Sequence, residues 1–194
     1  MIIRKYACLN KNKYYNEHFS LEAIQDMHIE YIRKWRNKKK NILRQNKKIS
    51  KKQQTDYFIN NIWNDMNNKF PSNILLSFKI NKKLLGYGGL VNISWHNKRS
   101  EVSLLIKSEV DESSAEYRQY LNNFFLILKK IAFDELKFKK LTSETFIFRK
   151  NHIKILESND FNNEGRLISQ YYQKNKFIDS LLHSCFKNSK QKNS

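Results

Sequence analysis

The chain has 194 residues, enough for one well-packed core, and its 40% hydrophobic and 13% aromatic content excludes a disordered protein. A formal net charge of +19 indicates either an anionic partner, such as a nucleotide, a nucleic acid or a membrane surface, or a coat of solvated lysines. The basic residues are scattered along the whole chain, which favours the solvated coat and ranks a nucleic-acid binder last.

Cysteine usage and apolar runs exclude further classes. Cys8 and Cys185 lie far apart and form neither a disulfide framework nor a metal pair. The five histidines show no metal-ligand spacing. The N-terminal residues continue into polar sequence unlike a signal peptide, and no apolar run approaches the roughly 20 residues that span a bilayer. We therefore expect a cytoplasmic protein without a metal ion or a membrane partner.

The first part of the chain predicts one strand and two helices. Residues 18–24 alternate as a strand, and the apolar residues from Ile24 to Trp35 recur at helical spacing. Ser50 and Gln53 have the spacing of a capping box, in which each side chain satisfies the other residue's free backbone N–H. A second helix therefore begins at Ser50 and ends before the single proline.

The hydrophobic period then changes to that of strands. Residues 74–80, 84–95 and 99–106 predict three strands joined by polar turns. Gly86, Gly88 and Gly89 fall inside the middle strand, where they indicate a bulge or close packing. They do not form a phosphate loop, because no Gly-Lys-Ser/Thr follows.

A long amphipathic helix from residue 117 to 136 follows, and Ser113 and Glu116 have capping-box spacing at its start. The remaining apolar pattern predicts a strand at 140–146, a short helix at 149–159 and a hairpin of 166–172 with 177–186. We expect one domain over residues 1–186 and a flexible basic tail at 187–194. The order β-α-α-β-β-β-α-β-α-β-β places the chain in the α/β (α+β) class.

Several stretches resemble the GNAT N-acetyltransferase superfamily. Residues 131–146, IAFDELKFKKLTSETF, resemble its third helix and fifth strand, residues 152–167 are similar to the next helix and its continuation, and residues 170–179 resemble the closing hairpin. Trp35-Arg36-Asn37 resembles members that acetylate amino sugars on nucleotide carriers in surface-polysaccharide biosynthesis, and also ribosomal-protein N-terminal acetyltransferases. The resemblance covers most of the chain and implies a mixed, mostly antiparallel V-shaped sheet flanked by helices.

The resemblance also implies a reaction, the transfer of an acetyl or similar acyl group from acetyl-CoA to a primary amine. In this family the pantetheine arm lies along the fourth strand like an added strand, which here is residues 99–106. The pyrophosphate rests on the N-terminus of the next helix, where free N–H groups favour an anion. The donor contacts implied are Ser103, Leu104, Leu105, Ile106, Lys107, Arg118, Gln119, Tyr120, Leu121 and Arg149.

The chain departs from the family pattern in two places. The glycine-containing pyrophosphate turn aligns with residues 116–121, which contain no glycine, and four acidic residues between 109 and 116 oppose a bound phosphate. A tyrosine that protonates the leaving thiolate aligns with Leu156, and a CoA-contacting asparagine aligns with Arg149. These departures leave open a non-catalytic relative that kept the fold and lost CoA binding.

Acetylation of an amine requires a base that accepts its proton. Glu101, early on the 99–106 strand, is the first candidate, with a simple ion pair to Arg99 as the alternative, and Glu144 on the following strand is the second. An amino sugar on a nucleotide carrier is the first choice of acceptor, and a protein or peptide N-terminus is the second. The oligomeric state stays open, with a homodimer as one option. Candidate acceptor contacts are Trp35, Arg36, Asn37, Arg44, Trp95 and His96.

Overall fold

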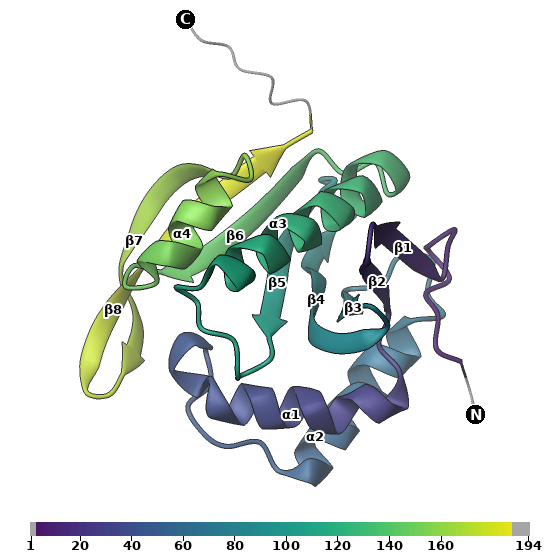
Figure 1. Ribbon diagram of the computed structural model, residues 1–194, viewed down its shortest axis with the longest axis horizontal. Coiled ribbons are helices and arrows are strands. Elements are labelled where there is room, and N and C mark those ends of the chain that lie inside the picture. Colours follow the sequence, from purple (N-terminus) through teal and green to yellow (C-terminus); the bar gives the residue numbers. More distant parts are fainter. Residues whose placement is uncertain (1–2, 188–194) are drawn as a thin grey trace, which may run out of the picture.

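The computed structural model describes residues 3–187 (Figure 1). In this part of the chain an eight-stranded sheet has the order β1-β2-β3-β4-β5-β6-β8-β7, and all neighbouring strands are antiparallel except β5 and β6. The strands are β1 (Lys13–Asn16), β2 (Phe19–Ala23), β3 (Ile74–Ile80), β4 (Lys83–Ser94), β5 (Arg99–Ile106), β6 (Lys140–Phe146), β7 (Asn162–Gln173) and β8 (Lys176–Phe186). The α-helices are α1 (Ile29–Lys38), α2 (Lys51–Tyr57), α3 (Ala115–Lys129) and α4 (Lys150–Glu157). The α/β class and the mostly antiparallel sheet expected from the sequence are confirmed.

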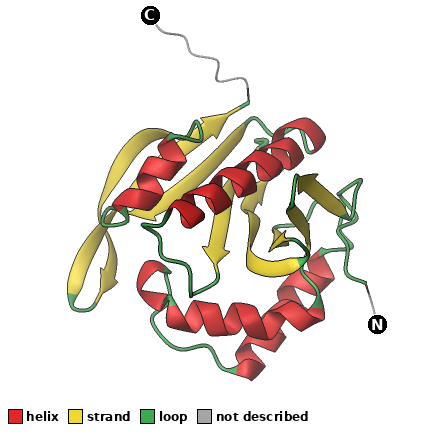
Figure 2. Cartoon of the chain, viewed as in Figure 1, coloured by secondary structure: helices red, strands yellow, loops and turns green. Residues whose placement is uncertain are grey.

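Helices cover both faces of the sheet. Tyr87 and Gly88 are neighbours on β4, so these two positions face opposite sides. Phe124 of α3 lies directly over Gly88, whereas Arg36 of α1 donates a hydrogen bond to the hydroxyl of Tyr87. Figure 2 shows α3 and α4 crossing the front of the sheet, with α1 and α2 at its lower end. The chain therefore forms a helix–sheet–helix sandwich around the central strands.

Most predicted elements are confirmed. The strands at 74–80, 99–106 and 140–146 have the predicted ends. The capping box of α2 is present, because Ser50 accepts from the Gln53 N–H and the Gln53 side chain accepts from the Ser50 N–H. Helices α2 and α3 each continue as a π-helical segment, at Phe58–Trp63 and Lys130–Glu135 respectively. These segments explain why the apolar stripes in the sequence are longer than the α-helices.

The sequence misses one strand and places one helix cap at the wrong serine. The sequence does not predict β1, which is only four residues long and forms because it pairs with β2. The N-cap of α3 is Ser114, whose hydroxyl oxygen accepts from the Tyr117 N–H. Ser113 is not the cap, because its hydroxyl donates to Asp111 instead.

The glycines of β4 permit close backbone packing, one of the two predicted roles. A Cβ atom on Gly88 would lie 2.2 Å from the carbonyl oxygen of Ser103, and one on Gly89 would lie 2.0 Å from that of Ile74. Gly89 also has φ of +144°, which side chains with a Cβ rarely adopt. The two glycines let β3, β4 and β5 approach each other at the centre of the sheet.

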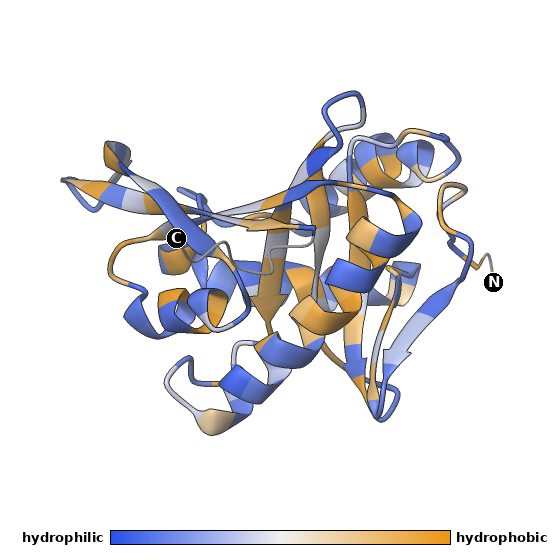
Figure 3. Ribbon diagram, turned by 90° about the horizontal axis from the view of Figure 1, so that it is seen from above, coloured by the Kyte–Doolittle hydropathy of each residue, from blue (hydrophilic) through white to orange (hydrophobic). Residues whose placement is uncertain are grey.

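Phenylalanines dominate the core between α3 and the sheet. Phe78 stacks against Phe19 with ring centroids 5.7 Å apart and meets Phe124 edge-on at 5.5 Å. All three are at most 2% exposed, and burial of each contributes roughly 1.5–3 kcal/mol to folding. Figure 3 shows this hydrophobic concentration on the central strands and on α3. None of the helices in residues 3–187 is long and apolar enough to cross a membrane. The predicted tail lies outside the described residues, apart from Lys187.

Candidate active site at the fork of the sheet

Strands β5 and β6 are paired over three residues and then separate. Their parallel pairing joins Arg99, Ser100 and Glu101 to residues 140–142 and stops there. Strand β6 continues to pair with β8 as far as Phe146. Within the described part of the chain, the β5 edge beyond Glu101 therefore has no strand partner on that side. Such an edge offers free backbone groups to an extended ligand.

A cavity of about 260 Å³ opens at this point, and we call it the fork cavity. Its walls come from β4, β5, β6, α1 with the segment that follows it, α3 and the start of α4. Seven of the residues predicted from the sequence line it, although they are spread over more than 100 positions of the chain. These residues are Arg36, Arg44, Glu101, Ser103, Leu104, Glu144 and Arg149.

The two predicted carboxylates share a cation. Arg44 lies 2.7 Å from Glu144 and 3.6 Å from Glu101, so its guanidinium bridges β6 and β5 across the fork. The Ser180 hydroxyl on β8 also donates to Glu144, at 2.6 Å. Arg44 packs over the Tyr171 ring, 5.0 Å from its centroid. The ion pair of Glu101 with Arg99 that the sequence left as an alternative is replaced by this contact with Arg44.

Asn92 is a site residue that the sequence analysis missed. Between Val91 and Ser94, β4 has one residue more than the opposing segment of β5, which makes a β-bulge. Asn92 occupies the bulge with φ of +50°, a left-handed conformation that asparagine tolerates better than most residues. Its side-chain amide donates to Glu101 at 2.8 Å. The sequence does contain a signal for this residue, because Asn92 interrupts the apolar run of the strand predicted at 84–95.

A second cavity of about 460 Å³ lies between the sheet and helices α1 and α2, and we call it the helix-side cavity. It shares Arg36, Val91, Asn92 and Ser103 with the fork cavity, so the two adjoin at the base of the fork. No Asp or Glu is among the described residues that line it. Its other polar lining residues are Gln53, Gln54, Tyr57, Asn73 and Tyr87.

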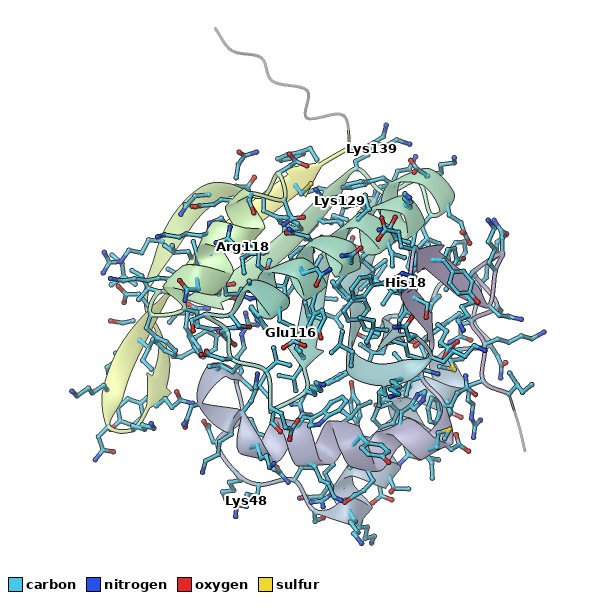
Figure 4. The ribbon with its side chains drawn as sticks, viewed as in Figure 1. His18, Lys48, Glu116, Arg118, Lys129 and Lys139 are labelled. Carbon is cyan, nitrogen blue, oxygen red and sulfur yellow. The ribbon has the colours of Figure 1, made fainter. Side chains whose placement is uncertain are left out.

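The start of α3 differs from the expected phosphate-binding turn. Because α3 begins at Ala115, residues 118–121 lie inside the helix. The side chains of Tyr120 and Leu121 are 6% and 0% exposed and face the core, and the donor contacts expected of these two residues stay predictions. Contacts from Arg118, labelled with Glu116 at this end of α3 in Figure 4, and from Gln119 stay predictions, since both side chains are exposed.

Ion pairs neutralise part of the acidic charge in the loop before α3. Arg149, at the N-cap of α4, lies 2.8 Å from Glu112, and exposed Lys38 lies 3.3 Å from Glu109. The Lys39 ammonium donates to the carbonyl of Val110 at 3.2 Å, and burial lowers the pKa of this lysine. Two of the four acidic residues that the sequence places here, Glu109 and Glu112, are therefore paired with cations from α1 and from the N-cap of α4.

A buried histidine borders the fork cavity next to Arg149. His152 is 5% exposed, and its Nδ1 lies 2.9 Å from the Tyr117 hydroxyl. Burial, and then the charge of Arg149, holds the pKa of His152 well below its usual range, so the ring is neutral. The Tyr117 hydroxyl thus forms a hydrogen bond with His152, and its oxygen also accepts one from Arg149 at 3.3 Å. Leu156, which aligns with the tyrosine that protonates the leaving thiolate, is fully buried, and its side chain has no proton to donate.

Four predicted acceptor contacts lie outside both cavities. Trp95 packs between Phe70 and Phe138 and donates to a backbone carbonyl, and His96 is exposed in the turn beside it. Trp35 is 7% exposed in the core. The Asn37 side chain bonds both backbone groups of Ile49, which anchors the loop before α2. The two tryptophans make packing contacts and Asn37 anchors a loop, and Trp35 and Asn37 also line a third hollow beside α1. The acceptor contacts expected of these residues and of His96 stay predictions.

The remaining predicted donor contacts are the main-chain groups of Leu105 and Ile106 and the side chain of Lys107. Leu105 and Ile106 are 4% and 2% exposed, so only their main-chain atoms are available to a ligand. The N–H of Lys107 already donates to the carbonyl of Leu85 at 2.8 Å, which leaves its side chain.

The site fits an acyl-CoA in its main features. The β5 edge from Val102 to Ile106 would hold the pantetheine arm, as an unpaired strand edge does for any extended chain. The first N–H groups of α3 and the guanidinium of Arg149 would hold the phosphates. Glu112 competes for Arg149, so a phosphate must exchange with this carboxylate. No group of three or more His, Cys, Asp or Glu residues in the described part of the chain is arranged to hold a metal ion.

Comparisons with known proteins agree with this geometry. Residues 21–182 match the family described as "Acetyltransferase (GNAT) domain". No curated protein matches the chain. The spermidine N-acetyltransferase from Vibrio cholerae in complex with CoA and spermine is similar in structure, with a TM-score of 0.75 at 15% identity over 88% of this chain and 96% of that chain. A dodecameric structure of spermidine N-acetyltransferase from Vibrio cholerae gives a TM-score of 0.67 at 15% identity, covering 88% and 95%.

Proposed function

The chain belongs to the GNAT acetyltransferase family, whose members transfer an acyl group from acyl-CoA to an amine, and we propose that its acceptor is an amino sugar on a nucleotide carrier. In this proposal the sugar occupies the helix-side cavity and its amine reaches Glu101 in the fork cavity. The lining of the helix-side cavity is the observation that carries the proposal.

That lining favours a neutral polyhydroxylated molecule. Amide and hydroxyl groups of Gln53, Asn73 and Tyr87 both donate and accept hydrogen bonds, as sugar hydroxyls require. Tyr57 adds an aromatic surface of the kind that packs against the apolar face of a sugar ring. Arg36 is the charged group there, and it suits an anionic carrier better than a cation.

A polyamine, the substrate of the structural neighbours by their names, is less well matched. A polyamine carries several positive charges and needs carboxylates along its length. Among the described residues, none of the lining groups of the helix-side cavity is a carboxylate. The net charge of +19 adds long-range repulsion toward any polycation.

The chain's own residues provide for the proton and for orientation. Glu101 accepts the proton of the substrate ammonium, directly or through one water, and Asn92 fixes the direction of this carboxylate. Free N–H groups on the β5 edge stabilise the oxyanion that forms when the amine attacks. The acyl-CoA supplies the acetyl thioester, whose C–S bond breaks as the amide forms, and CoA leaves as the thiol after it takes up a proton. Arg44 lies between the two carboxylates and must yield to the incoming ammonium.

A panel of acceptors tests the proposal. Release of free CoA thiol would be measured with a nucleotide-linked amino sugar, the free amino sugar, spermidine and a peptide with a free N-terminus. We expect the nucleotide-linked amino sugar to have the highest kcat/KM, by about tenfold or more, because it fills both cavities. A higher kcat/KM with spermidine or with the peptide would overturn the proposed acceptor.

A further inference from the structure

We propose that a groove on the outer side of α1 binds a nucleoside diphosphate, at a site separate from the fork and helix-side cavities. The groove has a volume of about 800 Å³. It runs beside α1, and its other walls are the start of β4 and the first residues after β5. It shares no lining residue with either cavity of the active site, so the inference does not depend on the proposed acceptor.

The groove gathers uncompensated positive charge. Lys34, Lys48 and Lys83 line it, are exposed, and make no ion pair with any described residue. Lys38 faces the single carboxylate of the groove, Glu109, in a pair whose side chains are 66% and 58% exposed. An exposed pair of this kind is weak and exchanges readily with another anion. A ligand in the groove therefore meets four ammonium groups and one carboxylate, which selects for phosphates.

An aromatic wall indicates more than a phosphate. The Tyr31 ring is 55% exposed at the groove and packs beside the buried Trp35, with ring centroids 6.3 Å apart. Leu84 adds an apolar side chain to the same lining. An exposed ring held by a buried neighbour is a rigid platform on which a planar base can stack. In this groove the lysines would bind the phosphates of a nucleotide, and the Tyr31 ring would stack on its base.

The distribution of the basic residues favours a small nucleotide over a nucleic acid. A nucleic-acid surface needs basic residues in a continuous stripe several nucleotides long. Here the unpaired lysines face one groove, and the other basic residues are distributed over the molecule. Lys48 lies at the lower margin of Figure 4 beside α1, whereas Lys139 lies at the opposite, upper end.

Calorimetric titration with UDP and ADP tests the site. We expect binding that weakens as the salt concentration rises and that persists in saturating CoA, because the groove is separate from the donor edge. The double variant Lys34→Gln/Lys83→Gln should weaken nucleotide binding by about tenfold or more. Tyr31→Ala should weaken binding of the nucleotides but not of inorganic pyrophosphate. The control variant Lys139→Gln, also exposed, should bind like the wild type.

Three results would overturn the inference. These are the absence of nucleotide binding at millimolar concentration, displacement of the nucleotide by CoA, and equal affinity in the double variant and the control. Single-stranded oligonucleotides whose affinity grows steadily with length would also contradict it, since they would identify a nucleic-acid surface instead. Circular dichroism of each variant would confirm that these exposed substitutions leave the fold intact.

Discussion

The guanidinium of Arg44 lies 2.7 Å from the carboxylate of Glu144, and the same group reaches Glu101 at 3.6 Å. Strands β5 and β6 have separated just before this point, so one cation bridges both branches of the fork. An ammonium that enters the fork cavity meets two carboxylates that share one guanidinium, so one negative charge of the pair is left uncompensated. Because Arg44 lies closer to Glu144 than to Glu101, we expect the two acidic residues to differ in function.

Replacement of Glu101 should impair catalysis more than replacement of Glu144. Glu101→Gln removes the proposed base and should lower kcat by about 10²–10⁴-fold with little change in the acceptor KM. Glu144→Gln should lower kcat less than about tenfold, because Glu144 is held by Arg44 and Ser180 and its main contacts are structural. Steady-state kinetics with the best acceptor measures both. Equal losses in the two variants would reject Glu101 as the specific base.

Removal of the bridging cation should change substrate binding. Arg44→Gln leaves both carboxylates free for the acceptor ammonium, so the acceptor KM should fall by about three- to tenfold. The free energy of unfolding should fall by no more than about 1 kcal/mol, because the Arg44 side chain is 40% exposed. Arg44→Lys keeps the charge and should restore the wild-type KM. A KM that rises in Arg44→Gln would show that Arg44 contacts the acceptor directly.

Acetyl-CoA should stabilise the protein despite the glycine-free turn before α3. At about 100 times its dissociation constant, a ligand of the native state adds about 2.7 kcal/mol, which corresponds to roughly 5–10 °C in Tm for a chain of this size. Arg149→Gln should reduce the shift, because it removes a proposed phosphate contact. Thermal denaturation with and without acetyl-CoA measures it. An unchanged Tm for the wild type would mean that Glu112 and its neighbours exclude the donor.

Acid should destabilise the fold through its buried histidines. Burial, and then the charge of Lys79, lowers the pKa of His28 to about 4, and burial also holds the pKa of His152 well below its usual range. In the unfolded chain both return to about 6.5. Between these values the unfolded state binds the proton and the native state does not, so the free energy of unfolding falls as pH drops from about 6.5 toward 4. Urea denaturation at a series of pH values should show a shallower fall for His28→Gln, and an identical fall would contradict this origin.

Two glycine substitutions should differ in their effect on stability, because Gly88 lies against a neighbouring strand and Gly165 has open space around it. In Gly88→Ala the new Cβ would lie 2.2 Å from the backbone oxygen of Ser103, so we expect a loss of at least about 2 kcal/mol of stability. Gly165→Ala meets nothing within 4 Å and should change stability by no more than about 0.5 kcal/mol. Chemical denaturation compares the two. A well-folded Gly88→Ala variant of wild-type stability would disprove the close strand packing.

The sequence predicts the fold better than it predicts the site. The strands at 74–80, 99–106 and 140–146 are found because apolar alternation, flanked by polar turns, marks both of their ends. The carboxylates Glu101 and Glu144 are found because they are polar residues in such strands. The short β1 has no such pattern of its own, since its pairing with β2 creates it.

The site residues that were missed or misplaced depend on contacts that the sequence does not encode locally. Asn92 reaches Glu101 only because of a bulge. The turn that the sequence aligns with residues 116–121 lies inside α3, because the helix already begins at Ala115. Trp95 is a packing residue because Phe70 and Phe138, distant in sequence, enclose it.

The order of the two cavities along the chain has a consequence for chimeric enzymes. Except for Ser103, the helix-side cavity is built from residues that precede β5, whereas the unpaired edge and the phosphate-facing residues belong to β5 and to the elements after it. If the helix-side cavity holds the acceptor as proposed, a chimera joined near the β4–β5 turn would exchange the acceptor preference of two such enzymes and keep the donor edge of one of them.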